Sequence, residues 1–133
     1  MKLETATTAG SRRFLILGWI CSAIPILMMG VGAIIMAITN EAAVAQGLAK
    51  YGYPTHVGPT ILALEISCAL IYAIPQTAVL GAILITGYLG GAVATHVRAG
   101  EPQWFIPVVL AAIAWLGILL RDKRLRQLLF VRR

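Results

Sequence analysis

Charged side chains are scarce in this sequence of 133 residues. Only 12% of the residues are Asp, Glu, Lys or Arg, and only five of these are acidic, whereas soluble domains carry roughly a quarter. A chain with so little charge does not cover a water-exposed surface, which argues against a cytosolic enzyme. It also argues against a disordered chain, because disorder needs low hydrophobicity and high charge.

Cysteine and histidine are equally sparse, with two of each. Cys21 and Cys68 lie inside apolar runs, whereas a secreted disulfide framework needs more cysteines in a loop-rich chain. At equal depth, the two thiols either form a redox pair or pack as small apolar groups. His56 and His96 lack a third ligand at metal-binding spacing, and no phosphate-binding loop or nucleophile motif occurs. The sequence therefore predicts no metal site and no covalently bound cofactor, and argues against an independent enzyme.

Apolar residues, by contrast, make up 59% of the chain and give a mean hydropathy of +0.86. They fall into four runs, and about 20 apolar residues suffice to cross the hydrocarbon core of a bilayer. The sequence predicts an all-α fold in which residues 1–133 form a single transmembrane domain, a four-helix bundle. The predicted spans are residues 14–38, 59–74, 77–95 and 104–120, with a polar loop at residues 97–103.

The loop between the first two spans carries a further helix signal. Thr39 or Asn40 suits an N-cap, and Glu41 suits the first helical turn. Apolar side chains then recur at i, i+4 and i+7 (Val44, Leu48 and Tyr51). This spacing predicts a short amphipathic helix lying on the outer membrane surface.

Nine of the eleven cations lie near the two ends of the chain: Lys2, Arg12, Arg13, Arg121, Lys123, Arg124, Arg126, Arg132 and Arg133. Basic ends that flank apolar spans follow the positive-inside pattern, which predicts that both termini are cytoplasmic. The same placement argues against a nucleic-acid partner despite a net charge of +6. Residues 121–133 are expected to form a basic cytoplasmic tail. The tail either lies on the anionic leaflet or stays solvated and only sets the topology.

Glu65 is the acidic residue inside an apolar span, where a charge costs at least about 2.5 kcal/mol. The very short turn after the second span predicts an antiparallel hairpin that brings Glu65 within reach of Tyr88. Cys68 and Tyr72 follow Glu65 at i+3 and i+7, so the three share one helix face. We expect this face to turn inward. It either lines a ligand pocket or forms a seam of satisfied polar contacts.

The third span has two further features. Gly87, Gly91 and Thr95 are spaced four apart, which is typical of a small-residue ridge that lets another helix approach closely. His96 and Arg98 follow at the outer interface. They are expected either to bond to loop backbone or to hold an anion or a quinone carbonyl.

Three stretches occur in a definite order: Tyr51-Gly-Tyr-Pro54, Leu64-Glu65, and Gly90-Gly-Ala-Val-Ala-Thr-His96 followed by Arg98. This arrangement, over about residues 12–120, resembles the DoxX-like family of small four-helix bacterial membrane proteins. Relatives of that family are similar to the DoxD subunit of thiosulfate:quinone oxidoreductase. The resemblance implies a redox-accessory or quinone-linked role in the bacterial inner membrane, with membrane oxidoreductase subunits as partners. It marks Glu65 and His96 as positions of interest.

The leading hypothesis is a bundle that binds a hydrophobic small molecule such as a quinone. Glu65 would be its polar contact, assisted by Tyr72 or Tyr88. His96 and Arg98 would close the outer mouth. The first alternative is a structural subunit without a ligand, whose glycine ridge docks a second copy or a partner helix. A lower-ranked alternative is a small proton-coupled transporter using the same acid. The lipid bilayer is the partner common to all three.

Overall fold

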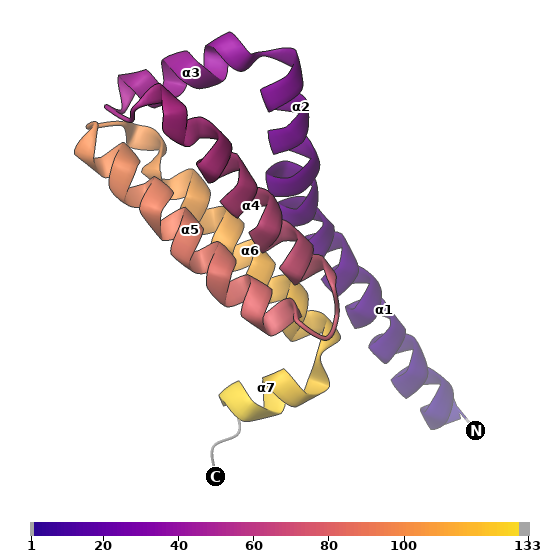
Figure 1. Ribbon diagram of the computed structural model, residues 1–133. Coiled ribbons are helices and arrows are strands. Elements are labelled where there is room, and N and C mark those ends of the chain that lie inside the picture. The colour runs from indigo at the N-terminus through magenta and orange to yellow at the C-terminus, as the bar shows by residue number, and fades with distance from the viewer. Residues whose placement is uncertain (1, 131–133) are drawn as a thin grey trace.

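The computed structural model describes residues 2–130 (Figure 1). Within this range the chain is helical and contains no strand, which confirms the all-α prediction. The elements in chain order are α1 (Lys2–Pro25), η1 (Ile26–Gly32), α2 (Ala33–Thr39), α3 (Glu41–Lys50), η2 (Thr55–Val57), α4 (Gly58–Ala73), α5 (Ala78–Arg98), η3 (Pro102–Trp104), α6 (Phe105–Arg121) and α7 (Lys123–Phe130).

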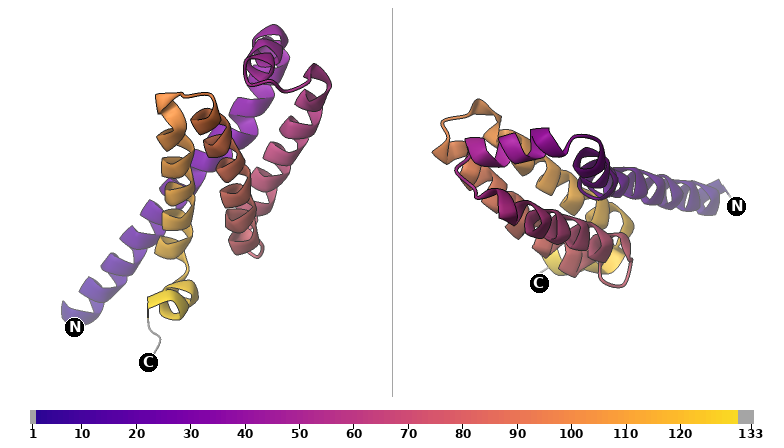
Figure 2. Two further views of the ribbon diagram at one scale, coloured as in Figure 1. Left: turned by 90° about the vertical axis from the view of Figure 1, so that its left-hand side faces the viewer. Right: turned by 45° about the horizontal axis from the view of Figure 1, so that its top comes forward.

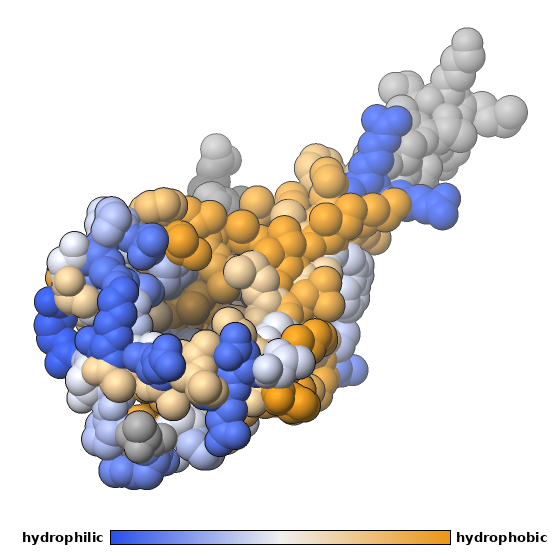
Figure 3. Space-filling view, turned by 90° about the horizontal axis from the view of Figure 1, so that it is seen from above, coloured by the Kyte–Doolittle hydropathy of each residue, from blue (hydrophilic) through white to orange (hydrophobic). Residues whose placement is uncertain are grey.

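Three stretches are long and apolar enough to cross a membrane: Arg12–Thr39, Ala78–Arg98 and Pro102–Arg121. Helix α4 is also apolar but has only 16 residues. Large apolar side chains point outward all along these helices; Leu70, for example, is 61% exposed. Seen from above (Figure 3), hydrophobic residues cover much of the helical surface, and the end nearest the viewer is hollowed. The chain is therefore a membrane protein.

The first apolar stretch is not one regular helix. Pro25 ends α1, and a π-helical segment, η1, separates it from α2. Proline has no backbone N–H and its ring collides with the carbonyl four residues earlier, so a helix commonly bends or widens next to it. Figure 1 shows the resulting change of direction between α1 and α2. Helix α2 is thereby separated from the top of α4, leaving space between them.

Helices α4 and α5 form the predicted antiparallel hairpin. Helix α4 ends at Ala73, and the Thr77 hydroxyl donates to the carbonyl of Ile71 at 2.7 Å within the turn. A Cβ at Gly81 would overlap the backbone of Tyr72, so only glycine permits this close approach of the two helices. Helix α5 continues to Arg98, which corrects the predicted loop at residues 97–103. Because the helix keeps its hydrogen bonds through this turn, the loop begins at Ala99.

The apolar core joins η1, α4, α5 and α6, and α1 is attached to it through contacts at Tyr72 and along α6. The fully buried Tyr72 places its hydroxyl between two helices, donating to the Ala114 carbonyl at 2.7 Å and lying 3.1 Å from Ser22 Oγ. Gly18 and Gly117 let α1 and α6 pack closely, since a Cβ at Gly18 would lie 2.9 Å from the Gly117 carbonyl oxygen. This contact holds the long first stretch against the rest of the bundle.

Helix α3 crosses the opposite end of the bundle, as Figures 1 and 2 show. Of the two predicted caps, Asn40 is the one used: its Oδ1 accepts from the Ala43 N–H at 3.4 Å. Gly52 makes the turn after the helix with a φ of 75°, a conformation that glycine adopts without strain. A helix is thus present where one was predicted.

Helix α7 lies beyond α6, at the same end of the molecule as the N-terminus (Figure 2). Asp122 breaks α6 with an extended backbone, and its Oδ1 accepts from the N–H groups of Arg124 and Leu125 at 2.8 and 3.2 Å. The predicted basic tail therefore contains a short capped helix. Residues 131–133 of the tail lie outside the described range.

Candidate functional site

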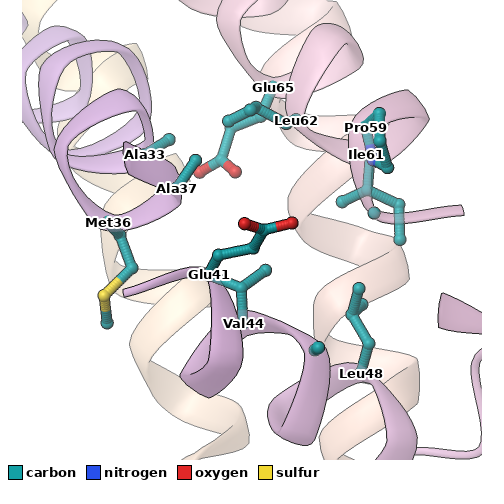
Figure 4. Close-up of a pocket in the computed structure, with 12 residues that line it drawn as sticks. Ala33, Met36, Ala37, Glu41, Val44, Leu48, Pro59, Ile61, Leu62 and Glu65 are labelled. Atoms are coloured by element: carbon teal, nitrogen blue, oxygen red, sulfur yellow. The ribbon is translucent and has the colours of Figure 1, made fainter. Parts of the chain in front are cut away.

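A cavity of about 410 Å³ lies between α2, α3 and α4. Most of its wall is aliphatic, and two carboxylates interrupt that wall. Figure 4 shows the side chains of Glu41 and Glu65 pointing into the space from different helices. The lining residues are Ala33, Met36, Ala37, Glu41, Val44, Ala45, Leu48, Gly58, Pro59, Ile61, Leu62 and Glu65.

Glu65 is held in place by the hairpin. It is partly buried on α4, and its Oε2 accepts a hydrogen bond of 2.9 Å from the Tyr88 hydroxyl on α5. The expectation that Glu65 turns toward other helices and lies within reach of Tyr88 is therefore met. One carboxylate oxygen is bonded to Tyr88, while the carboxylate as a whole is directed into the cavity (Figure 4).

Glu41 also lines the cavity. The sequence predicts its place in the first turn of a helix but not its place in a cavity. It lies in the first turn of α3, directly after the Asn40 cap. A signal for its position was present, because Glu41, Val44 and Leu48 are spaced i, i+3 and i+7 and so share one helix face. Val44 and Leu48 line the cavity, and Glu41 lies on the same apolar side of the helix.

Cys68 and Tyr72 do not line the cavity, although they share a helix face with Glu65. Both are buried deeper in the bundle, where Tyr72 bonds to the Ala114 carbonyl of α6. The cavity is lined by α2, α3 and the first half of α4. Further along α4, η1 packs against the helix at Ala69, and Ser22 of α1 and Ala114 of α6 contact Tyr72. Cys68 and Cys21 are both free thiols in the structure.

His96 and Arg98 lie outside the cavity and belong to a group of polar side chains at the C-terminal end of α3. We call this group the outer network; it comprises Lys50, Tyr51, His96, Arg98 and Glu101. The Glu101 carboxylate is its centre: Oε1 pairs with Lys50, and Oε2 accepts from the Tyr51 hydroxyl at 2.7 Å and lies 2.7 Å from His96 Nδ1. Arg98 donates to the backbone carbonyl of Tyr51.

These contacts keep Glu101 ionised. The hydrogen bonds from Lys50, Tyr51 and His96 lower the pKa of Glu101 to about 2. The same carboxylate raises the pKa of the Lys50 ammonium and of the Tyr51 hydroxyl. The outer network thus attaches the C-terminal end of α3, which is one wall of the cavity, to the end of α5. His96 and Arg98 belong to this attachment and are not among the residues that line the cavity, so their contact with a ligand stays a prediction.

Within residues 2–130, the three glycines of the α5 ridge meet no other helix. A Cβ at Gly87, Gly90 or Gly91 would have no neighbouring atom within 4 Å. Thr95 donates to the Gly91 carbonyl and lies 2.8 Å from the hydroxyl of Tyr53. Docking of another chain on this ridge stays a prediction, while the close helix contacts observed here use Gly18, Gly81 and Gly117.

His56 lies in η2 and is exposed. Among the residues that the structure describes, no three or more His, Cys, Asp or Glu side chains gather in a metal-binding arrangement. The groups able to contact a bound molecule are therefore the two carboxylates and the aliphatic wall of the cavity.

Comparison with known proteins agrees with the resemblance noted from the motifs. A sequence model of the DoxX-like family matches residues 20–117, a stretch that contains the cavity and the outer network. No curated protein and no solved structure matches the chain. Because the matched stretch covers well over half of the sequence, the chain belongs to the DoxX-like family.

Proposed function

We propose that α4 is a fourth transmembrane span and that the chain crosses a bacterial inner membrane four times, as one domain. Three observations support this topology. Helix α4 runs antiparallel to α5 (Figure 1) and presents Leu64 and Leu70 outward. The N-terminus and α7 lie at the same end (Figure 2), as an even number of spans requires. The cations gathered at that end favour the cytoplasm. In the proposed topology, the cavity and α3 lie at the outer surface.

We propose further that the chain binds a hydrophobic small molecule in the cavity, with Glu65 as the polar contact. The observation that carries this proposal is a carboxylate directed into an apolar space of about 410 Å³. This volume lies within the range of small-molecule pockets, about 300–1,000 Å³. An acid inside an apolar span is costly, and Tyr88 bonds to only one of its oxygens. A ligand that hydrogen-bonds to the other oxygen would offset part of this cost.

The cavity suits a quinone as one such ligand. The aliphatic side chains of α2 and α4 would contact the ring, and the Glu65 carboxyl would bond to a ring oxygen. A bound quinone would supply electron transfer, while this chain would contribute binding, orientation and a hydrogen bond at Glu65. We therefore propose a redox-accessory role beside membrane oxidoreductase subunits, as the family resemblance implies.

The test uses the full chain in detergent and a short-chain ubiquinone as the probe, with thermal unfolding as the readout. We expect the quinone to raise the unfolding temperature of the natural chain. Glu65→Gln should reduce that rise, and Ala37→Phe should abolish it by filling the cavity without changing a charge. Equal stabilisation of all three chains would show that the quinone binds elsewhere and would overturn the proposed site.

A second candidate function is docking of another membrane helix on the α5 ridge. The observation that favours it is the open face at Gly87 and Gly91, where the chain has no contact of its own. The partner is either a second copy or another membrane protein. In a background without Cys21 and Cys68, Gly91→Cys should give one discrete crosslinked band in membranes. A uniform smear or no product would contradict docking.

A further inference from the structure

The charges around the cavity restrict the kind of ligand that it takes. Of the twelve lining residues, only Glu41 and Glu65 carry a charge, and both are acidic. They come from α3 and α4, and Figure 4 shows both carboxylates directed toward the same space. No Lys, Arg or His is among the lining residues. Glu41 is exposed in the first turn of α3, where the helix end favours a carboxylate, whereas Glu65 is partly buried. With both groups ionised, the cavity has a negative potential that no lining side chain opposes.

The nearest basic residues along the chain are already engaged elsewhere. Lys50 and Arg98 are the cations that lie between residues 14 and 120. Lys50 pairs with Glu101, and Arg98 donates to the Tyr51 carbonyl, both in the outer network. The basic helix α7 lies at the other end of the bundle (Figure 1), and Asp122 directly precedes it. Within the described part of the chain, neither Lys50 nor Arg98 therefore supplies a positive group to the cavity, and a bound cation would do so.

The uncharged part of the cavity wall indicates the chemistry of such a molecule. Ten of the twelve lining residues are uncharged, and most are aliphatic side chains from three helices. A bare metal ion would leave this wall unused, and hard cations prefer six or more oxygen ligands. An ammonium group on an apolar chain would suit both the carboxylates and the aliphatic wall. Its N–H groups donate to the carboxylates, and its chain displaces water from the wall.

We propose that the cavity binds an amphipathic organic cation, with its ammonium head between Glu41 and Glu65 and its alkyl part against Ala33, Ala37 and Leu62. This inference rests on the proposed ligand site at Glu65 and names lipophilic amines as a ligand class that the site takes beside neutral molecules such as a quinone. Such molecules partition into a bilayer and reach the cavity from the outer leaflet.

The experiment compares two probes that share one alkyl chain and differ in the charged or neutral head group. Radiolabelled decylammonium and the neutral decanol are titrated against the full chain in phosphatidylcholine nanodiscs at pH 7. We expect decylammonium to bind at least about tenfold more tightly than decanol, as charge-assisted hydrogen bonds predict. Glu41→Gln and Glu65→Gln should each weaken decylammonium binding by about tenfold and leave decanol binding unchanged. Glu65→Gln keeps an oxygen that accepts from Tyr88, so the hairpin contact survives.

Two control variants separate the possible outcomes. Asp122→Asn removes one negative charge far from the cavity and should bind decylammonium like the natural chain. Ala37→Phe fills the cavity and should weaken binding of both probes. If both probes bind equally, the Gln variants change neither and Ala37→Phe weakens both, the cation inference is wrong while the cavity remains a ligand site. If neither probe nor the short-chain ubiquinone binds, the proposed function fails with it.

Discussion

Tyr88 donates a hydrogen bond of 2.9 Å to Glu65 across the α4–α5 hairpin. The two residues are 23 positions apart in the sequence, and the short turn at the end of α4 brings them to the same depth. This bond fixes one oxygen of the carboxylate and so orients the side chain toward the cavity. The orientation of Glu65 therefore depends on a residue of α5 that does not itself line the cavity.

Replacing Tyr88 by Phe should destabilise the hairpin and disorder Glu65. Interhelical hydrogen bonds in membranes contribute about 0.6 kcal/mol on average and at most about 1.7, so we expect a loss of stability in that range. Unfolding by dodecyl sulfate in mixed micelles measures it. Tyr53→Phe is the matched control, because its hydroxyl contact to Thr95 is exposed and should contribute less. Equal losses in the two variants would contradict a special role for the Tyr88 contact.

The helices, the hairpin contact and the helix cap depend on residues close together in the sequence, so the sequence predicts them. The apolar runs indicate the helices, because lipid imposes helical hydrogen bonding on each run. The Glu65–Tyr88 contact follows from the hairpin, since the length of a short turn sets the register of its two arms. The N-cap at Asn40 likewise follows from a side chain that bonds within three residues.

The cavity and the outer network could not be predicted in the same way. The convergence of Glu41 and Glu65 depends on the direction that α2 takes after the π-helical segment, and on the single residue between α2 and α3. The spacing of residue types determines neither the angle between α1 and α2 nor the angle between α2 and α3. The contact of Tyr51 with Glu101 joins positions 50 residues apart. A shared face predicts which side chains point the same way, but the neighbouring helices decide whether that face meets a cavity, as at Glu65, or a packed core, as at Tyr72.

The outer network should make stability depend on acid pH. The pKa of Glu101 is lowered from 4.5 to about 2, so the folded state favours the ionised form. A depressed carboxyl pKa stabilises the fold fully above the ordinary value, and this stabilisation is lost as the pH falls from about 4.5 toward 2. The natural chain should therefore show a constant unfolding temperature between pH 7 and 5 and a decline below pH 4.5.

Glu101→Gln tests the origin of this decline. The variant lacks the titrating group, so its unfolding temperature should fall less steeply below pH 4.5 and should lie below that of the natural chain at pH 7. Asp122→Asn, which removes an acid outside the network, should keep the natural profile. Parallel profiles for the natural chain and Glu101→Gln would rule out Glu101 as the titrating group.

Removing the Tyr72 hydroxyl should weaken the packing of three helices. Tyr72 is fully buried and donates to the Ala114 carbonyl at 2.7 Å. Tyr72→Phe keeps the ring and loses this bond, so we expect a decrease of about 1 kcal/mol in the free energy of unfolding. Tyr72→Ala also leaves a cavity and should cost about 3–5 kcal/mol. An unchanged stability of Tyr72→Phe would show that the hydroxyl contributes nothing to helix packing.

Two glycines of α5 should respond oppositely to the same substitution. A Cβ at Gly81 would overlap the backbone of Tyr72, whereas a Cβ at Gly91 would meet no atom within 4 Å. Gly81→Ala should therefore destabilise the chain by about 1–3 kcal/mol through overpacking. Gly91→Ala should be neutral, or stabilising by up to about 1 kcal/mol, because alanine favours the helix. Unfolding of the isolated chain in mixed micelles measures both.

The same pair also decides whether the α5 ridge docks another helix. In a monomer, Gly91 has open space beside it, and added bulk has no structural cost. If a second copy packs on this ridge, a larger side chain at Gly91 separates the helices and weakens their association. Gly91→Leu should then abolish dimers measured by energy transfer in liposomes, while Val79→Ala, elsewhere on the exposed face of α5, should not. Dimers of equal strength in both variants would place any self-association on another face of the bundle.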